Sequence, residues 1–390
     1  MTEIARGLEG VKFTETRLSK VDGQAGELTI AGFPLEELAP NASFEEVLFL
    51  LWNDRLPTAS ELTDLRVRMM AQRELPPAAI NVLREAAARH LGPMDGIRMG
   101  VDTVGLCSPE PHMEGMVDVG CAVALTAHMA TIAAAYWRLL RGLKPVAPKP
   151  DLGHAANYLY MLTGEAPHPD AARALETYLN TVVDHGMNAS TFTARVIVST
   201  RADMVAAIVG ALGALKGPLH GGAPGPALDM VFEIQARAAT SGKSVADEAE
   251  TWAKETVASG GRIMGFGHRV YKVRDPRADV LDQAARKLFA RTGEQKLYHD
   301  ARTVEEVMVR VLEELKPGRG LKTNVEFYTA LILHGVGLEA EMFTPTFAVS
   351  RVGGWTAHVL EQAREDRLIR PDARYVGPLD RKWVPVDVRG

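Results

Sequence analysis

The sequence predicts an all-α protein with a trace of β near the N-terminus. From Ser43 to Arg364, apolar residues recur mostly at the spacing of an α-helix, and glycine or proline separates one such stretch from the next. In the first half of the chain, only Glu27–Ile30 alternates convincingly like a strand. With Val21–Gly23 it indicates a small hairpin bounded by glycines. Helix therefore dominates the predicted fold, with no internal repeat or low-complexity tract.

Composition narrows the class of protein. The chain has 390 residues, 46% hydrophobic and 24% charged, as in a soluble globular protein with room for two domains. Its net charge of −5 gives no indication of nucleic-acid binding. An anionic substrate must therefore be attracted by a local group of Arg and Lys side chains.

The cysteine content and the N-terminal residues indicate the cellular compartment in which the protein works. Cys107 and Cys121 are the only cysteines, too few for a disulfide framework, and we expect free, buried thiols. The first ten residues have neither the apolar core of a signal peptide nor the Arg/Ser bias of a transit peptide. We therefore expect a cytoplasmic protein.

Capping signals and apolar stripes predict the helices of the first half. Ser43 and Glu46 form a capping box ahead of a buried stripe that includes Phe44, Leu48 and Trp52. The most apolar run, Cys121–Leu140, is rich in Ala and interrupted by polar residues, which favours a buried helix over a membrane span. The other helices expected here cover residues 60–70, 77–90, 155–162 and 171–185, with a linker at 167–169.

The second half continues the helical pattern. Residues 202–216 are mostly Ala, Val and Leu around Gly210 and Gly213, so we expect a buried helix. Its small side chains would also suit a position at a subunit interface. The alternative is a poor helix weakened by glycine. Glycine and proline at 217–225 and 335–345 predict two hinges around an inserted domain. Further helices are expected at 227–239, 245–258, 278–291 and 304–315, and an apolar section at 325–338 leads through Phe343-Thr344-Pro345 into a last helix that ends near Arg364.

The segment Gly260–Arg277 carries the strongest functional signal. Its glycines, among them Gly265 and Gly267, allow the backbone to approach a ligand closely. His268 follows them directly and can donate a hydrogen bond to a carbonyl oxygen. The cations after it, which include Arg277, suit carboxylates, because guanidinium binds them through two parallel hydrogen bonds. The alternative is a glycine-rich surface turn with solvated charges.

Several familiar motifs are absent from the sequence. After Gly265 and Gly267, the third glycine position of a dinucleotide fingerprint holds Val270, and Arg237 replaces the first glycine of a P-loop before Gly242. No histidine pair has zinc spacing, and neither His-Glu-x-x-His nor Gly-x-Ser-x-Gly occurs. We therefore expect no metal, and a kinase, a triad hydrolase or a metalloenzyme is disfavoured.

Three further positions share the character of His268. His220 lies among glycines, His185 precedes Gly186, and Glu326 lies in an apolar segment. A lone histidine of this kind is more often structural, but the combination suits proton abstraction next to a carbonyl group. A carboxylate in an apolar pocket gains a raised pKa and becomes a usable base. A histidine that donates to the carbonyl oxygen stabilises the resulting enolate.

The chain resembles the citrate synthase family. The similarity lies in successive motifs that cover nearly the whole chain in the right order: GLEGV, VDGQAGEL, DHGMNASTFTARV, ALKG, GPLHGGA, GFGHRVYKVRDPR, TNVEFY, FTPTFAVSRVGGWTAHVLEQ and RPDARYVGP. The resemblance implies a mostly helical homodimer whose small domain closes over substrates. It places a large domain at 1–221 and 338–390, and the small domain at 222–337.

The resemblance also implies roles for single residues in an acyltransferase that condenses acetyl-CoA with oxaloacetate and needs no cofactor. His220 would hold the thioester carbonyl, Glu326 would take the methyl proton, and His268 would polarise the keto group. Oxaloacetate would be bound by His185, His268, Arg277 and Arg351, with Arg370 of the partner subunit. The residues expected to bind CoA are Arg262, Met264, Gly265, Gly267, Lys272, Lys316, Arg319 and Asn324.

Two positions depart from the family pattern. Glu326 stands where the family usually has aspartate, and one extra methylene moves the carboxylate by roughly an ångström. Ala223-Pro224-Gly225 replaces the usual Ala-Asn-Glu after His-Gly-Gly. Both indicate a divergent branch, so the acyl-CoA could be acetyl- or propionyl-CoA, the latter for a 2-methylcitrate synthase. An alternative from another class is a non-catalytic paralogue that binds CoA or a dicarboxylate.

Overall fold

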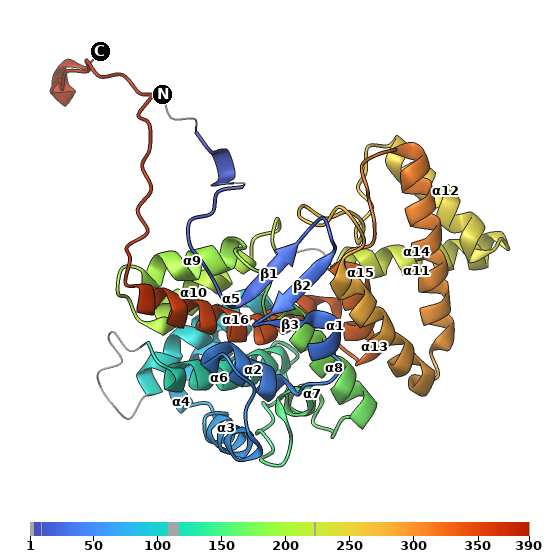
Figure 1. Cartoon of the computed structure of the whole chain (residues 1–390), viewed down its shortest axis with the longest axis horizontal. Coiled ribbons are helices and arrows are strands. Elements are labelled where there is room, and N and C mark those ends of the chain that lie inside the picture. Colours follow the sequence, from blue (N-terminus) through green and yellow to red (C-terminus); the bar gives the residue numbers. More distant parts are fainter. Residues whose placement is uncertain (1–3, 9, 108–116, 222–223, 390) are drawn as a thin grey trace.

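A computed structural model gives the fold and describes residues 4–8, 10–107, 117–221 and 224–389. It confirms the predicted class, with α-helices throughout and one small antiparallel sheet near the N-terminus (Figure 1). The sheet contains β1 (Ser19–Asp22), β2 (Glu27–Ile30) and β3 (Phe33–Pro34) in that order. Val21 pairs with Leu28, so the hairpin predicted from the alternation is confirmed.

The body of the molecule surrounds two long helices, α6 (Val119–Leu140) and α16 (Phe343–Glu365), which pack against each other. Apolar side chains on α16, such as the fully buried Trp355, fill the core. The other body helices are α1 (Leu35–Leu38), α2 (Phe44–Asn53), α3 (Ala59–Ala71), α4 (Pro77–Ala88), α5 (Pro93–Asp102), α7 (His154–Thr163), α8 (Pro169–Val182), α9 (Ala189–Val198) and α10 (Met204–Leu215).

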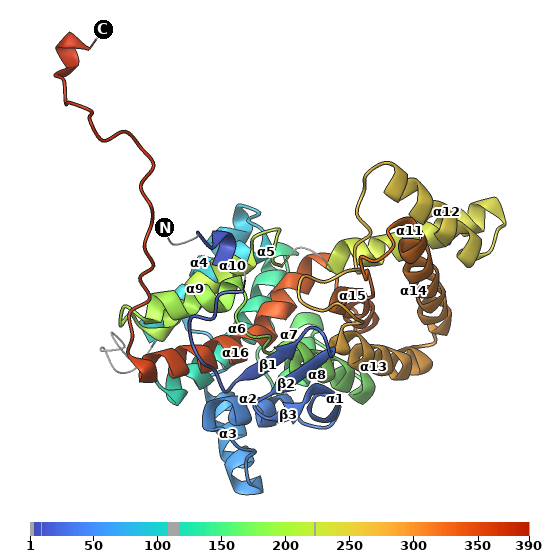
Figure 2. The same cartoon turned by 45° about the horizontal axis from the view of Figure 1, so that its top comes forward.

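A lobe beside this body contains the remaining α-helices. Figures 1 and 2 show α11, α12 and α14 projecting from the body, with α13 and α15 next to it. α13 packs against α15 within the lobe and against α8 of the body. The helices of the lobe are α11 (Pro224–Ser241), α12 (Val245–Ala258), α13 (Pro276–Thr292), α14 (Gln295–Leu315) and α15 (Val325–Gly335).

Local signals placed most helix starts correctly. Ser43 and Glu46 form the predicted capping box of α2. Helix α3, however, begins at Ala59 and not at Ser60 as predicted. Thr58 caps it and forms a capping box with Glu61. The predicted helix 171–185 ends at Val182, so His185 lies in the turn that follows α8. The helix predicted at 304–315 begins already at Gln295, and α5 and α9 were not expected.

The long apolar helix α6 is buried, as predicted. By length and composition α6 could cross a membrane, and 83% of its most apolar window is buried inside the protein. Polar groups on it are satisfied by the helix itself, since Thr126 donates to the carbonyl of Ala122. Cys121, also on α6, is a buried free thiol as expected, whereas the side chain of Cys107 lies outside the described part.

The chain ends in a segment that leaves the body. Figures 1 and 2 show the residues after α16 as an extended tail, with a short 3-10 helix (Val386–Val388) near its end. Bulky apolar side chains lie exposed along the tail, among them Val376 at 88%, Leu379 at 84% and Trp383 at 80%. Three more 3-10 helices cover Arg6–Leu8, Thr103–Cys107 and Ala340–Met342.

Candidate active site

One large cavity, of about 1730 Å³, is lined by predicted site residues from both the body and the lobe. Its lining includes all three residues expected to be catalytic: His220, His268 and Glu326. It also includes His185, Arg277, Arg351, Arg370, Arg262, Met264, Gly265, Gly267, Lys316, Arg319 and Asn324. Lys272 is exposed and is not among the lining residues, so it is the one predicted site residue that the fold leaves outside.

The glycine loop before His268 pairs with the segment before α15. Asn324 donates from its backbone N to the carbonyl of Gly265 (3.0 Å) and from Nδ2 to that of Gly267 (2.8 Å). Both glycines have positive φ, +86° and +84°, and a Cβ on Gly267 would lie only 2.9 Å from Leu321. The pairing therefore requires glycine, and it holds His268 beside the first turn of α15, which carries Glu326.

Backbone amides fix the tautomer of His268. Its Nδ1 accepts hydrogen bonds from the N–H groups of Val270 (3.1 Å) and Tyr271 (3.0 Å). A neutral imidazole with an accepting Nδ1 carries its proton on Nε2. Burial, with the nearby Arg277, lowers the pKa of His268 to about 4, so the ring is neutral near pH 7. His268 is therefore a neutral donor through Nε2.

Two donors converge at this point of the cavity. Arg277 Nη2 lies 3.2 Å from His268 Nε2, and both atoms carry hydrogen. An oxygen acceptor within hydrogen-bonding distance of both nitrogens would satisfy both groups. Asp275 fixes the guanidinium from behind, accepting from Nε at 3.0 Å and from Nη2 at 2.8 Å, and it also accepts from Val325 N at the start of α15. This buried carboxylate thus joins the cation to the helix of Glu326.

A second buried guanidinium, Arg351, comes from α16. Its Nε donates to the carbonyl of Val182 at 2.7 Å, and its guanidinium carbon lies 4.4 Å from the ring centroid of Phe347. Burial lowers its pKa to about 10, so the group stays charged near neutrality. With Arg277, it gives the inner cavity two buried cations, a suitable charge for a dicarboxylate.

His185 is held by a buried network behind it. The neighbouring Asp184 accepts from Ser19 Oγ at 2.5 Å and pairs with His358 Nε2 at 3.0 Å. Ser19 Oγ in turn accepts from Gly186 N at 2.8 Å, which closes the turn around His185. Burial, with the nearby cations Arg277 and Arg351, lowers the pKa of His185 well below its usual value. The ring is therefore neutral.

His220 contacts a serine that is itself fixed. Its Nε2 lies 2.8 Å from Ser190 Oγ, which accepts from Trp355 Nε1 at 3.1 Å and lies 2.8 Å from Asn188 Oδ1. Burial, with the charge of Arg351, lowers the pKa of His220 to about 4. The imidazole is therefore neutral, and its single N–H is free for a carbonyl oxygen when the Ser190 hydroxyl donates to Nε2 instead of to Asn188 Oδ1.

Glu326 has the properties of a general base. It lies in the first turn of α15, where its backbone N donates to Asn324 Oδ1 at 3.0 Å. Burial raises the pKa of its carboxyl group to about 7, against the opposing charge of Arg277. A carboxylate with a pKa near the working pH is both partly ionised and basic enough to accept a proton from carbon. The expectation of a raised pKa in an apolar setting is therefore supported.

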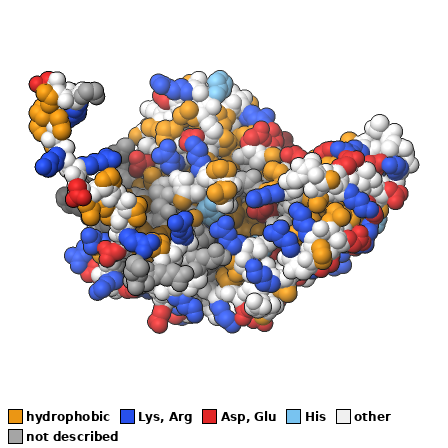
Figure 3. All heavy atoms as spheres, turned by 90° about the horizontal axis from the view of Figure 1, so that it is seen from above, with side chains coloured by type: hydrophobic (Ala, Val, Ile, Leu, Met, Phe, Trp, Pro, Cys, Tyr) orange, Lys and Arg blue, Asp and Glu red, His pale blue; other side chains and the backbone are white. Residues whose placement is uncertain are grey.

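Cations lie toward the outside of the same cavity. Arg262, Arg319 and Arg370 are exposed, and Lys316 is partly exposed. In the face seen in Figure 3, several Lys and Arg side chains lie near the middle of the molecule. Such cations suit the phosphates of an extended anionic ligand. Among the described residues, no three His, Cys, Asp or Glu side chains form a group that could hold a metal ion.

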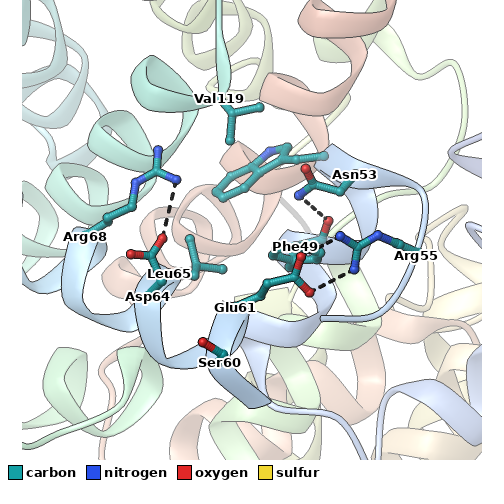
Figure 4. Close-up of a pocket in the computed structure, with 10 residues that line it drawn as sticks. Phe49, Asn53, Arg55, Ser60, Glu61, Asp64, Leu65, Arg68 and Val119 are labelled. Atoms are coloured by element: carbon teal, nitrogen blue, oxygen red, sulfur yellow. Dashed lines mark hydrogen bonds and ion pairs between the residues drawn. The ribbon is translucent and has the colours of Figure 1, made fainter. Parts of the chain in front are cut away.

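A second cavity, of about 440 Å³, lies between α2 and α3 (Figure 4). Its charged side chains already pair with one another: Arg55 with Glu61 at 2.5 Å, and Arg68 with Asp64 at 4.0 Å. None of the residues predicted from the sequence to act in a site lines it. The large cavity is therefore the candidate active site.

Sequence reasoning missed several supporting residues. Ser190 lies in the motif DHGMNASTFTARV and Asp275 in the motif GFGHRVYKVRDPR, but no role was predicted for either residue. No local sequence pattern identifies Tyr271 or His358 as a supporting residue. Each contacts a residue that is far away in the chain. The replacement at Ala223-Pro224-Gly225 stays without structural detail, because residues 222 and 223 and the Pro224 side chain lie outside the described part.

Comparisons with known proteins identify the family. The family model for the citrate synthase C-terminal domain matches residues 7–372. The chain is 41% identical to citrate synthase of Haloferax volcanii, over 99% of both chains. It is also 36% identical to 2-methylcitrate synthase of Mycobacterium tuberculosis, over 96% of this chain and 91% of that protein.

A solved structure extends the similarity to three dimensions. Citrate synthase from Thermoplasma acidophilum, in ternary complex with carboxymethyl coenzyme A and oxaloacetate, superimposes with a TM-score of 0.88. The two chains are 32% identical, and the match covers 100% of each. Helical fold, cavity and sequence therefore lead to one conclusion: this chain belongs to the citrate synthase family and is an enzyme that transfers an acyl group.

Proposed function

We propose that the enzyme condenses acetyl-CoA with oxaloacetate and water to give citrate and CoA. The observation that carries the proposal is the single cavity that holds Glu326, His220, His268 and two buried arginines. The Thermoplasma acidophilum protein, whose structure contains oxaloacetate and a CoA derivative, supports the choice of substrates. The reaction needs neither a metal nor a redox cofactor, since bases and hydrogen-bond donors of the chain carry every step.

Oxaloacetate occupies the inner end of the cavity in this proposal. Its keto oxygen accepts from both His268 Nε2 and Arg277 Nη2, the two donors that lie 3.2 Å apart. Arg277, Arg351 and His185 hold its carboxylates, and Arg370 of the partner subunit completes the set. The bond from His268 polarises the keto group and makes its carbon electrophilic.

Acetyl-CoA approaches from the outer side. Glu326 takes a proton from the methyl group, while His220 donates to the thioester oxygen and stabilises the enolate. The enolate carbon attacks the keto carbon of oxaloacetate, and hydrogen bonds from His268 and Arg277 stabilise the new alkoxide. The proton that Glu326 took from the methyl group balances the negative charge of the alkoxide, and its return regenerates the base. Water then cleaves the thioester of the bound citryl-CoA and releases CoA as a free thiol.

The CoA portion is assigned to the outer cavity. Arg262, Lys316 and Arg319 supply cations for the phosphates, and Asn324, Gly265, Gly267 and Met264 line the path toward Glu326. Lys272 is left out of this assignment because its side chain is exposed and its Nζ lies 3.3 Å from the carbonyl of Arg269.

The proposed enzyme is a cytoplasmic homodimer. The outer face of α10 presents the small apolar residues Ala206, Val209 and Gly213, and a Cβ on Gly213 would meet no atom within 4 Å. Such a flat face allows a helix of a second copy to approach closely. The exposed apolar side chains of the tail also suit burial against a partner subunit. A large domain (1–221 and 338–390) and a small domain (222–337) close over the substrates.

Release of free thiol tests the reaction. Purified enzyme is incubated with oxaloacetate and, separately, with acetyl-CoA, propionyl-CoA and butyryl-CoA. We expect the highest kcat/KM with acetyl-CoA and no release without oxaloacetate. A preference for propionyl-CoA would instead identify a 2-methylcitrate synthase, which the similarity to the Mycobacterium tuberculosis protein supports as the second candidate. Absence of turnover with every acyl-CoA would overturn both.

A further inference from the structure

Tyr271 lies among three side chains that the proposed function assigns to oxaloacetate. Its hydroxyl oxygen is 3.1 Å from His185 Nε2, and its ring centroid is 4.8 Å from that of His268. The guanidinium carbon of Arg277 lies 5.8 Å from the same ring centroid. Tyr271 is only 1% exposed and is not among the residues that line the cavity. It therefore contacts the residues of the site from behind.

The bond between Tyr271 and His185 joins two neutral groups. Burial raises the pKa of the Tyr271 hydroxyl, and burial with the nearby arginines lowers the pKa of the His185 ring. A neutral imidazole has one donor and one acceptor nitrogen, so a fixed partner on Nε2 determines which edge of the ring faces the cavity. Without that partner the ring could turn over, and a buried nitrogen would lose its hydrogen bond.

The β1–β2 hairpin contacts both the turn of His185 and the loop of Tyr271. The hairpin β1–β2 holds the His185 turn through Ser19, whose Oγ accepts from Gly186 N. The same hairpin holds the Tyr271 loop, because Lys272 N donates to the carbonyl of Gly23 at 2.9 Å. A Cβ on Gly23 would lie 2.3 Å from the carbonyl oxygen of Val270, so the loop can approach only a glycine. The contact between Tyr271 and His185 thus rests on hydrogen bonds to one hairpin.

We propose that Tyr271 is a positioning residue for oxaloacetate. Its hydroxyl fixes the His185 ring in the orientation that binds a substrate carboxylate, and its ring supports His268 and Arg277. The inference rests on the proposed citrate synthase activity and assigns a role to a residue that does not line the cavity. Since the contacts of Tyr271 are with the oxaloacetate residues, its effect falls on oxaloacetate and not on acetyl-CoA.

The variant Tyr271→Phe removes one oxygen atom and keeps the ring. We expect the KM for oxaloacetate to rise on the order of tenfold, because a buried hydrogen-bonding group loses its partner. The KM for acetyl-CoA and kcat at saturating oxaloacetate stay within about twofold of wild type. Calorimetric titration with oxaloacetate alone shows the same loss of affinity.

The matched control is Tyr158→Phe. Tyr158 is fully buried, and its hydroxyl lies 3.0 Å from Thr346 Oγ1, so this variant also removes one internal hydrogen bond. Both variants are expected to unfold at a lower temperature, but only Tyr271→Phe changes the KM for oxaloacetate. Equal oxaloacetate affinity in both variants and wild type would overturn the role of Tyr271 and leave the proposed reaction intact. A wild-type enzyme that neither binds oxaloacetate nor releases thiol would overturn both.

Discussion

Thr344 donates a hydrogen bond of 2.6 Å from Oγ1 to the carbonyl oxygen of Gly221. Gly221 lies just before α11, and Thr344 lies at the start of α16, so the two chain segments that connect lobe and body meet. A Cβ on Gly221 would lie 2.9 Å from Thr344 Cγ2 and 2.4 Å from the carbonyl oxygen of Leu215. Both predicted hinges therefore lie side by side, as rotation of a lobe about one axis requires.

Oxaloacetate should close the lobe over the body. Its carboxylates attract Arg277 of the lobe and Arg351 of the body, and the bound state favours the conformation in which both reach them. Limited proteolysis should show slower cleavage in residues 224–335 with oxaloacetate than with acetate, which has a single carboxylate. Equal rates of cleavage with both ligands would argue against a moving lobe.

Replacement of Glu326 should separate binding from chemistry. Glu326→Gln removes the base and is expected to lower kcat by at least about a hundredfold, while calorimetry shows nearly unchanged affinity for oxaloacetate. Unchanged turnover would mean that another group takes the proton. Glu326→Asp is informative in either direction: a faster enzyme would show that the longer side chain is a handicap, and a slower one that the cavity is adapted to glutamate.

The pH dependence of the reaction should follow Glu326. The base must be ionised, so kcat/KM for acetyl-CoA is expected to rise with pH and level off above its pKa of about 7. His220 and His268, with pKa values of about 4, stay neutral over this range and add no further step. A profile that is flat from pH 5.5 to 8 would contradict the assignment.

The raised pKa of Glu326 also lowers the stability of the folded chain at neutral and higher pH. Its carboxyl keeps its proton up to about pH 7 in the folded chain, but only to about 4.5 when unfolded. The group therefore favours unfolding increasingly as pH rises from 4.5 to 7, and this cost is constant above pH 7. Glu326→Gln is expected to raise the free energy of unfolding by about 1–3 kcal/mol at pH 8 and to leave it unchanged at pH 4. Denaturant titrations at both pH values check this difference.

Ser190 should matter for the acyl-CoA half of the reaction. Ser190→Ala removes the partner of His220 Nε2, so the ring loses its fixed orientation, and kcat is expected to fall roughly tenfold to a hundredfold. The KM for oxaloacetate should change little. Ser350→Ala is the control, because Ser350 is buried and donates to the carbonyl of Leu179 at 2.6 Å without contacting His220. An equal loss of kcat in both variants would mean a general effect on folding.

Mixing two inactive variants tests whether Arg370 acts across the proposed dimer. In this single chain Arg370 lies at the outer cavity, and the tail after it leaves the body. If Arg370 serves the partner subunit, hybrids of Arg370→Ala and Glu326→Gln contain one complete site, and mixed subunits regain about a quarter of wild-type activity. If it serves its own chain, no hybrid has a complete site. Thiol release after joint refolding distinguishes the two arrangements.

Local patterns in the sequence determined much of the fold. The capping box at Ser43, the alternation at Glu27–Ile30 and the Ala-rich run of α6 each depend on near neighbours, and the structure confirms all three. Helix α5 was missed because Gly96 and Gly100 reduce its helix propensity. Packing explains the glycines: a Cβ on Gly96 would lie 2.2 Å from the ring of Tyr136 on α6.

By itself the sequence also determined which residues reach the cavity, through motifs that resemble one family, and Lys272 is the exception. Only the tertiary structure decided the chemical state of those residues. The proton on His268 Nε2 depends on two backbone amides, the pKa of Glu326 depends on burial, and the orientation of His185 depends on Tyr271, 86 positions away. Protonation and ring orientation respond to every group within a few ångströms, and only the folded chain fixes that neighbourhood.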